Sequence, residues 1–120
     1  MSPMTQYFKA INRTTGQVLS DKVKIAQDFK SRSIGLLNRT SLESGEGLLI
    51  KPCNSIHMFF MKFPIDVLFL DKKGRVVKIK MSLKPWRISS ALIYGYMVLE
   101  LPNGALNEAL VKLGDIIGFV

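Results

Sequence analysis

The sequence of 120 residues predicts a mainly β fold, either a compact antiparallel β-sandwich or a small distorted barrel, with one or two short α-helices. The first observation is a series of about eight short segments in which apolar residues alternate with polar ones or run together, as in strands. The second is the regular spacing of turn residues between them. The third is the lack of repeats and linkers, which predicts that residues 1–120 form a single domain.

The first half of the chain supplies three predicted strands and one helix. Residues 6–11 and 22–26 alternate apolar and polar side chains, and the turn NRTTG lies between them. Asp28 is suited to cap the N-terminus of a helix over residues 29–38. A loop with two glycines follows, and the segment GLLI begins the next strand.

The second half is dominated by IHMFFM and IDVLFL, which we predict to be two buried strands of one hairpin, joined through residues 62–64. The turn DKKG then leads into RVVKIKMSL, which alternates again. The segment KPWRISSALIYG is predicted to be irregular. We expect a strand at YMVLEL, a short helix within NGALNEALVK and a last strand after the turn LGD.

Charge and cysteine content restrict the classes of function. Lys and Arg number 17 against 9 Asp and Glu, giving a formal charge of +8, which favours encounters with nucleic acid, anionic surfaces or small anions. The one cysteine cannot form an internal disulfide, and the first twenty residues contain no apolar signal-like run. The longest nearly apolar run, 56–70, is too short to span a bilayer. We therefore predict a cytoplasmic protein.

The segment CNSIHMFFMKFPIDVLFLD holds the only cysteine, Cys53, and the only histidine, His57. A thiolate nucleophile needs an imidazole within hydrogen-bond reach. In one strand the two residues would share a face but stand about 13 Å apart. The alternative is a buried structural cysteine and a histidine satisfied by a backbone carbonyl. Within the expected hairpin His57 would also lie about 13 Å from Asp66, which argues against a direct dyad.

Asp66 lies among apolar residues, where an unpaired carboxylate would be costly. Two interpretations remain open: a buried acceptor that fixes the turn at Pro64, or a carboxylate that orients a ligand or acts as a general base. Arg32 and Arg39 are seven residues apart and would emerge on one side of the predicted helix. They suit an anionic ligand, although either could instead pair with a nearby acid.

The stretch KKGRVVKIKMSLKPWR carries seven basic residues and no acid. Lys78 and Lys80 share one strand face that could follow a phosphate backbone, with Lys84 and Arg87 further along. Trp86 could stack on a base, or cover one end of the core. The lysines could equally protect an edge strand from aggregation. The spacing of His, Cys and acidic residues predicts no metal site, and no cofactor-binding motif is present.

Several blocks in this order resemble the prokaryotic domain-of-unknown-function family 192: RSIGLLNR, CNSIHMFFMKFPIDVLFLD, PWR, VLELPNG and LGD. The resemblance covers about residues 20–120 and implies a mainly β fold with a short helix and no established activity. Many relatives carry secretion signals; the first twenty residues here show no such pattern, so we do not expect the location of those relatives to apply. The positions that match the family are Arg32, Gly35, Leu36, Arg39, Gly47, Pro52, His57, Met61, Pro64, Asp66, Asp71, Gly74, Pro85, Trp86, Leu99, Gly104, Gly114 and Asp115.

These observations favour a binding module with a modest pocket for a small anionic or polar ligand. Its predicted ligand-binding residues are Arg32, Arg39, His57 and Asp66, with Trp86 as a lid. One alternative is a small hydrolase or isomerase that uses Asp66 and His57 as acid and base. Another is an accessory protein that binds nucleic acid or an acidic partner through residues 72–87. The sequence predicts neither a particular reaction nor a particular oligomeric state.

Overall fold

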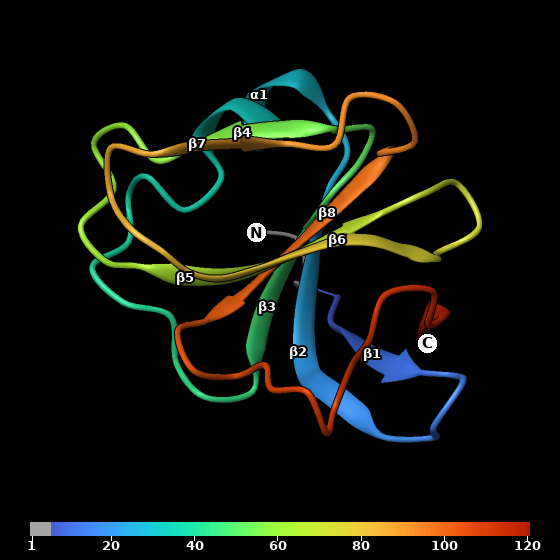
Figure 1. Ribbon diagram of the computed structural model, residues 1–120. Helices are drawn as coiled ribbons and strands as arrows, with labels where there is room; N and C mark the ends of the chain where they lie inside the picture. Colours follow the sequence, from blue (N-terminus) through green and yellow to red (C-terminus); the bar gives the residue numbers. More distant parts are fainter. Residues whose placement is uncertain (1–5) are drawn as a thin grey trace.

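The computed structural model describes residues 6–120, except for the side chains of residues 29, 30 and 33, and within this range the chain forms nine strands and one short helix (Figure 1). The mainly β prediction is therefore confirmed. The elements are β1 (Phe8–Asn12), β2 (Val18–Ala26), α1 (Phe29–Ile34), β3 (Glu46–Ile50), β4 (Ser55–His57), β5 (Ile65–Leu70), β6 (Val76–Leu83), β7 (Ile88–Ser90), β8 (Met97–Pro102) and β9 (Ile117–Phe119).

Seven strands form one curled sheet in the order β6-β5-β8-β3-β2-β1-β9, and β4 pairs with β7 in a second, two-stranded sheet. The pairings are antiparallel except for β2 with β3, which run parallel. Parallel strands require a crossover connection, and α1 lies in the segment that supplies it. The two edges of the large sheet approach each other through a bridge between Arg75 and Ile116, so the sheet has the form of a distorted barrel.

Each central strand contacts two hydrophobic cores, one on each face of the curled sheet. On β8 the side chains of Leu99 and Leu101 enter the core enclosed by the curl, whereas Val98 faces the other core. This second core lies between the sheet and a layer formed by α1, β4 and β7, which Figure 1 shows together on one side of the sheet. Because both faces are covered, β5 is buried along its whole length.

The predicted hairpin of IHMFFM and IDVLFL is wrong. β4 ends at His57 and pairs with β7, while β5 pairs with β6 and β8. Met58 diverts the chain: its N–H donates to the carbonyl of Arg87 at 2.7 Å, and its carbonyl accepts from the N–H of Trp86 at 2.7 Å. Met58 and Met61 are both buried in one turn, so the apolar run reflects burial rather than strand pairing.

Of the two helical segments considered, the one over residues 29–38 forms a shorter helix, and the second is not helical. Asp28 caps α1 as expected, its carboxylate accepting the N–H of Ser31 at 2.7 Å. The helix ends at Ile34 because Gly35 adopts a positive φ of 49°. The expected helix within NGALNEALVK is a series of turns instead, and the side chain of Asn107 accepts two backbone N–H groups there. Within the described part of the chain, no helix is long and apolar enough to cross a membrane.

Candidate functional site

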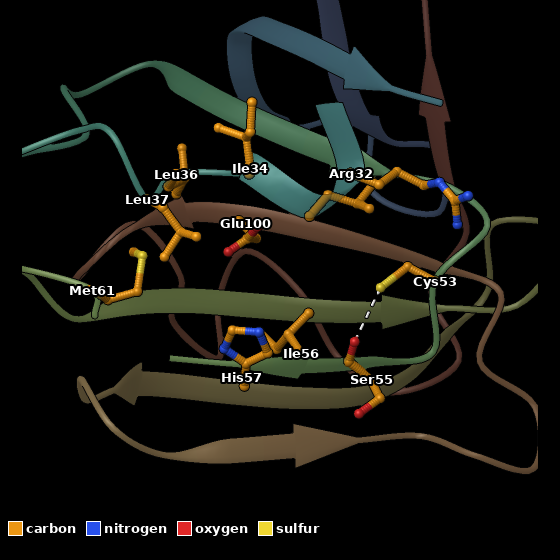
Figure 2. A pocket seen from close by; sticks show the side chains of 12 residues that line it. Arg32, Ile34, Leu36, Leu37, Cys53, Ser55, Ile56, His57, Met61 and Glu100 are labelled. Carbon is orange, nitrogen blue, oxygen red and sulfur yellow. Dashed lines mark hydrogen bonds between the residues drawn. The ribbon is translucent and has the colours of Figure 1, made fainter. Parts of the chain in front are cut away.

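A cavity of about 130 Å³ lies between the sheet, α1 with the turn that follows it, and β4 (Figure 2). It belongs to the side of the sheet that α1 and β4 cover. Most of its wall is apolar, contributed by Ile34, Leu36, Leu37, Ile50, Ile56 and Met61. Its polar side chains are those of Arg32, Cys53, Ser55, His57 and Glu100.

Glu100 reaches the cavity from the centre of the sheet. It lies on β8 between Leu48 of β3 and Val67 of β5, and strand alternation directs its side chain to the face that Val98 also uses. The residue is 6% exposed, and no described residue donates a hydrogen bond to its carboxylate. Burial raises the pKa of Glu100 from 4.5 to about 7. A titratable carboxyl group therefore forms part of the cavity wall.

Cys53 and His57 both line the cavity, each held by neighbouring backbone (Figure 2). The Cys53 thiol donates to the carbonyl of Ser55 at 3.2 Å, and burial raises the pKa of this thiol, with the Glu100 charge adding to the effect. His57 Nδ1 accepts the N–H of Phe59 at 3.3 Å, which leaves Nε2 to carry the proton of the neutral ring. A thiol with a raised pKa is a poor nucleophile, so this arrangement does not suit cysteine catalysis.

Arg32 lines the cavity from α1. Its Nη1 donates to the carbonyl of Pro52 at 3.1 Å, and Figure 2 shows its guanidinium pointing away from Glu100. Its Nε is buried and has no hydrogen-bond acceptor among the described residues. Arg32 and His57, both predicted as ligand-binding residues, therefore share one cavity.

The other predicted ligand-binding residues lie elsewhere. Arg39 follows the end of α1 and makes two hydrogen bonds to the Glu46 carboxylate, at 2.9 and 3.1 Å, instead of joining Arg32. The predicted convergence of the two arginines required a helix through residue 38, and the helix ends at Ile34. Trp86 does not line the cavity; it packs against Phe59 and Phe60 on the surface.

Asp66 faces the core inside the curl, away from the cavity. Its carboxylate accepts three backbone N–H groups, from Ser82 at 2.8 Å, Gly104 at 3.1 Å and Leu106 at 2.9 Å. These bonds tie the end of β6 and the loop after β8 to β5. The geometry matches the interpretation of Asp66 as a buried acceptor, although the bonds fix these two segments rather than the turn at Pro64.

The basic stretch is divided between fixed and exposed side chains. Lys78 Nζ donates to the carbonyl of Ser90 at 2.8 Å and lies over the ring of Phe69, so it is held against the protein. Lys80, Lys84 and Arg87 are exposed. In the part of the chain that the structure describes, no three His, Cys, Asp or Glu side chains are grouped to hold a metal ion.

Glu100 is the cavity residue that the sequence reasoning missed. The signal was present, because Glu100 is the one charged residue in the otherwise apolar segment YMVLEL, which is predicted to be a strand. An acid in such a strand must pair with another group, shift its pKa or face a cavity.

Comparison with known proteins identifies relatives across nearly the whole chain. The family model described as "Uncharacterized ACR", domain of unknown function 192, matches residues 10–119. A UPF0127 protein of Thermococcus sibiricus is 36% identical over 110 residues, which cover 88% of this chain and 70% of that protein. A UPF0127 protein of Pyrococcus horikoshii is 34% identical over 108 residues, which cover 88% of this chain and 93% of that protein.

Two solved structures share the fold. A protein of unknown function from Novosphingobium aromaticivorans has a TM-score of 0.81 at 22% identity, covering 98% of this chain and 93% of that one. A protein from Sinorhizobium meliloti, described as a candidate transcription regulator, has a TM-score of 0.81 at 23% identity, covering 99% and 98%. At these identities the likeness establishes the curled β fold and nothing about activity.

Proposed function

Since the chain belongs to domain-of-unknown-function family 192, an uncharacterised family, we propose a function from the cavity itself: the protein binds a small polar ligand there. The ligand donates a hydrogen bond to Glu100 or carries a positive charge beside it, and places a short apolar body against the aliphatic wall. The expectation of an anionic ligand is less favoured, because an anion would approach the carboxylate of Glu100.

The observation that carries this proposal is the isolation of Glu100. Buried polar groups in native proteins nearly always have a hydrogen-bond partner. A buried carboxylate without a partner lowers the stability by roughly several kcal/mol unless it takes up a proton. Here the carboxyl group lines an open space, and no described residue donates to it. A ligand with an N–H or O–H group would supply the missing donor.

The size and remaining polar groups narrow the ligand further. A cavity of about 150 Å³ holds a benzene molecule, so 130 Å³ suits a compound of about six non-hydrogen atoms. His57 lines the same cavity, and its Nε2 is free to donate a hydrogen bond. This donor favours a compound that also has an acceptor, such as a small amide or an amino alcohol.

A second candidate function is acid–base catalysis in the same cavity. Asp66 is less favoured as the base, because its carboxylate already accepts hydrogen bonds from three backbone N–H groups. Glu100 supports this candidate instead, since a pKa of about 7 is suited to exchanging protons near neutral pH. Conversion of a bound compound would favour catalysis, and recovery of the unchanged compound would favour binding.

A cytoplasmic location stays a prediction.

The test is a binding screen by protein-observed NMR with small amines, amides, alcohols and carboxylates. Resonances of the residues around the cavity should shift with amines or amides, and a compound at a hundred times its Kd should add about 2.7 kcal/mol of stability. Glu100→Gln should weaken that binding at least tenfold. The matched control is Glu108→Gln, which removes an exposed carboxylate away from the cavity and should leave binding unchanged.

Equal binding by Glu100→Gln and the unchanged protein would contradict the role of Glu100. Shifts that map only to other surfaces would contradict the cavity as the binding site.

A further inference from the structure

Three aromatic side chains form a cluster on the surface beside β4 and β7, which we call the aromatic tip: Phe59, Phe60 and Trp86. Phe60 is 71% exposed and Trp86 is 58% exposed. The ring of Trp86 lies 4.9 Å from that of Phe60 and 5.9 Å from that of Phe59, centroid to centroid. Large aromatic side chains are normally covered, so their gathering on the surface needs an explanation.

The backbone holds the aromatic tip in an unfavourable conformation. Phe60 has a φ of 64° and Trp86 a φ of 69°, in the left-handed region that bulky residues rarely adopt. The two turns are fixed to each other by the paired hydrogen bonds of Met58 with Trp86 and Arg87, and Met58 is fully buried beneath them. Strained residues held in this way are concentrated at functional sites.

A second group of exposed apolar residues lies at the other end of β7. Leu92, Ile93 and Tyr94 form a turn in which Ile93 is 84% exposed, and we call this the aliphatic tip. Between the two tips Ile88 of β7 is also exposed. Figure 1 shows β7 alongside β4, with these two loops at its ends. The segment 86–94 therefore exposes apolar side chains along its length.

Basic residues accompany both tips. Lys62, Lys84 and Arg87 are exposed within two residues of the aromatic tip. Lys72 and Lys73 line a shallow cleft together with Tyr94 of the aliphatic tip. The segments 57–63 and 82–94 contain no acidic residue. Asp71, which lines the cleft, accepts the backbone N–H groups of Lys73 and Arg75. The surface thus combines protruding apolar groups with surrounding positive charge.

We propose that this surface docks on an anionic lipid bilayer, with the two tips entering the interfacial region and the basic residues contacting lipid headgroups. Aromatic and aliphatic side chains next to lysines and arginines suit that boundary, where one part is apolar and the other negatively charged. This binding is peripheral and needs no membrane-spanning segment. It is independent of the ligand proposed for the cavity.

The positive charge of this surface would also suit single-stranded nucleic acid, but its apolar side chains are not suited to binding bases. A base needs a free ring face on which to stack. In the aromatic tip the rings are tilted by 33° and 59° and pack against one another. Ile88, Leu92 and Ile93 offer no aromatic face. All of these side chains can be buried in the apolar part of a bilayer, whereas few of them can stack on a base.

Trp86 is the chain's only tryptophan, so its fluorescence reports on the aromatic tip directly. Vesicles of phosphatidylcholine that contain roughly 30% phosphatidylglycerol should shift the Trp86 emission to shorter wavelength. Brominated lipids in the same vesicles should quench the Trp86 fluorescence. Pure phosphatidylcholine vesicles should give a much weaker response. Raising the salt concentration should weaken binding to the anionic vesicles, because the headgroup attraction is screened.

Variants separate the apolar and the charged contributions while keeping Trp86 as the probe. Phe60→Ser and Ile93→Ser should each weaken vesicle binding severalfold, and Lys84→Glu with Arg87→Glu should weaken it about tenfold or more. The matched controls are Val18→Ser and Lys22→Glu, which change exposed residues of β2 and should leave binding unchanged. Thermal unfolding confirms that each variant is folded.

Two results would overturn the proposal. One is the absence of any Trp86 response to anionic vesicles in the folded protein. The other is a response that a short oligothymidine produces at lower concentration than the vesicles do, which would assign the surface to nucleic acid.

Discussion

Asp66 and Glu100 are two buried carboxylates on neighbouring strands, and they face opposite sides of the same sheet. Asp66 pairs with Leu101 across β5 and β8, and the next pair along is Val67 with Glu100. Both acids lie in segments that are otherwise apolar, and both are almost completely buried. Their surroundings differ in one respect, which is the supply of hydrogen-bond donors.

Asp66 has three backbone donors, and all of them come from segments that its strand must hold in place. Glu100 has none among the described residues and lines a cavity instead. The comparison teaches that burial alone does not distinguish a structural acid from a binding acid. The number of donors that the protein itself provides does so, because a carboxylate without them is available to a ligand.

The largest expected effect is the loss of Asp66. Asp66→Ala removes the acceptor of three buried N–H groups and should lower the free energy of unfolding by about 3–5 kcal/mol. Urea unfolding followed by circular dichroism measures this. The matched control is Asp71→Ala, which also removes an acceptor of two backbone N–H groups but in an exposed turn, and should cost about 1 kcal/mol. Equal losses in the two variants would break the comparison.

The next effect is the pH dependence that Glu100 imposes. Because its pKa is raised from 4.5 to about 7, the folded protein holds this proton more tightly than the unfolded chain does. The free energy of unfolding should therefore fall as the pH rises through this window, by up to about 3 kcal/mol in all. Glu100→Gln, which cannot ionise, should be more stable than the unchanged protein at pH 8 and nearly equal to it at pH 4.5.

Urea unfolding of both proteins at several pH values tests this difference, and other titrating groups cancel in the comparison. A difference that does not change between pH 4.5 and pH 8 would contradict the isolation of Glu100 and would indicate a donor in the folded protein.

The elements that could be predicted from the sequence are those with a local cause. The mainly β fold follows from the alternating segments, and the start of α1 follows from Asp28, which caps it as expected. The pairing of β4 with β7 has no local cause. It depends on hydrogen bonds between Met58 and residues about thirty positions later, and IHMFFM has the composition of a strand wherever it pairs.

The same distinction applies to the candidate site. The sequence predicts Arg32 and His57 as ligand-binding residues, and both line the cavity. The contrast between Asp66 and Glu100 could not be predicted, because the donors of Asp66 come from Ser82, Gly104 and Leu106, which only the fold brings to it. The sequence shows that both acids lie in apolar segments, but it does not show which of them has hydrogen-bond donors.

A smaller effect concerns Glu46, a carboxylate with a side-chain partner. Its hydrogen bonds to Arg39 lower the pKa of Glu46 and raise that of Arg39. Both side chains are partly exposed, so Arg39→Ala should cost about 1 kcal/mol or less at pH 7. Because the pKa of Glu46 is lowered, this contribution is present above its unfolded value of 4.5 and is lost as the pH falls through the folded value.

Urea unfolding at pH 7 and pH 3, with and without added salt, measures the contribution of the pair. A loss above about 2 kcal/mol at pH 7, or one that salt does not reduce, would mean that the pair is more buried than its geometry indicates.

The smallest effect is the one that Glu100 exerts on Cys53. Burial is the main cause of the raised pKa of this thiol, and the negative charge of Glu100 adds to it. Glu100→Gln should therefore speed alkylation of Cys53 by iodoacetamide at pH 8 by about two- to threefold, since neutralising one nearby charge removes only a small Coulomb energy. Glu108→Gln, which changes an exposed acid elsewhere, should leave the rate unchanged.

Equal rates in all three proteins would mean that the carboxyl group of Glu100 is still protonated at pH 8, and its pKa would then lie even further from its ordinary value. A slower reaction in Glu100→Gln would instead show that the carboxylate assists the thiol, and the cavity would then have to be considered as a reactive site.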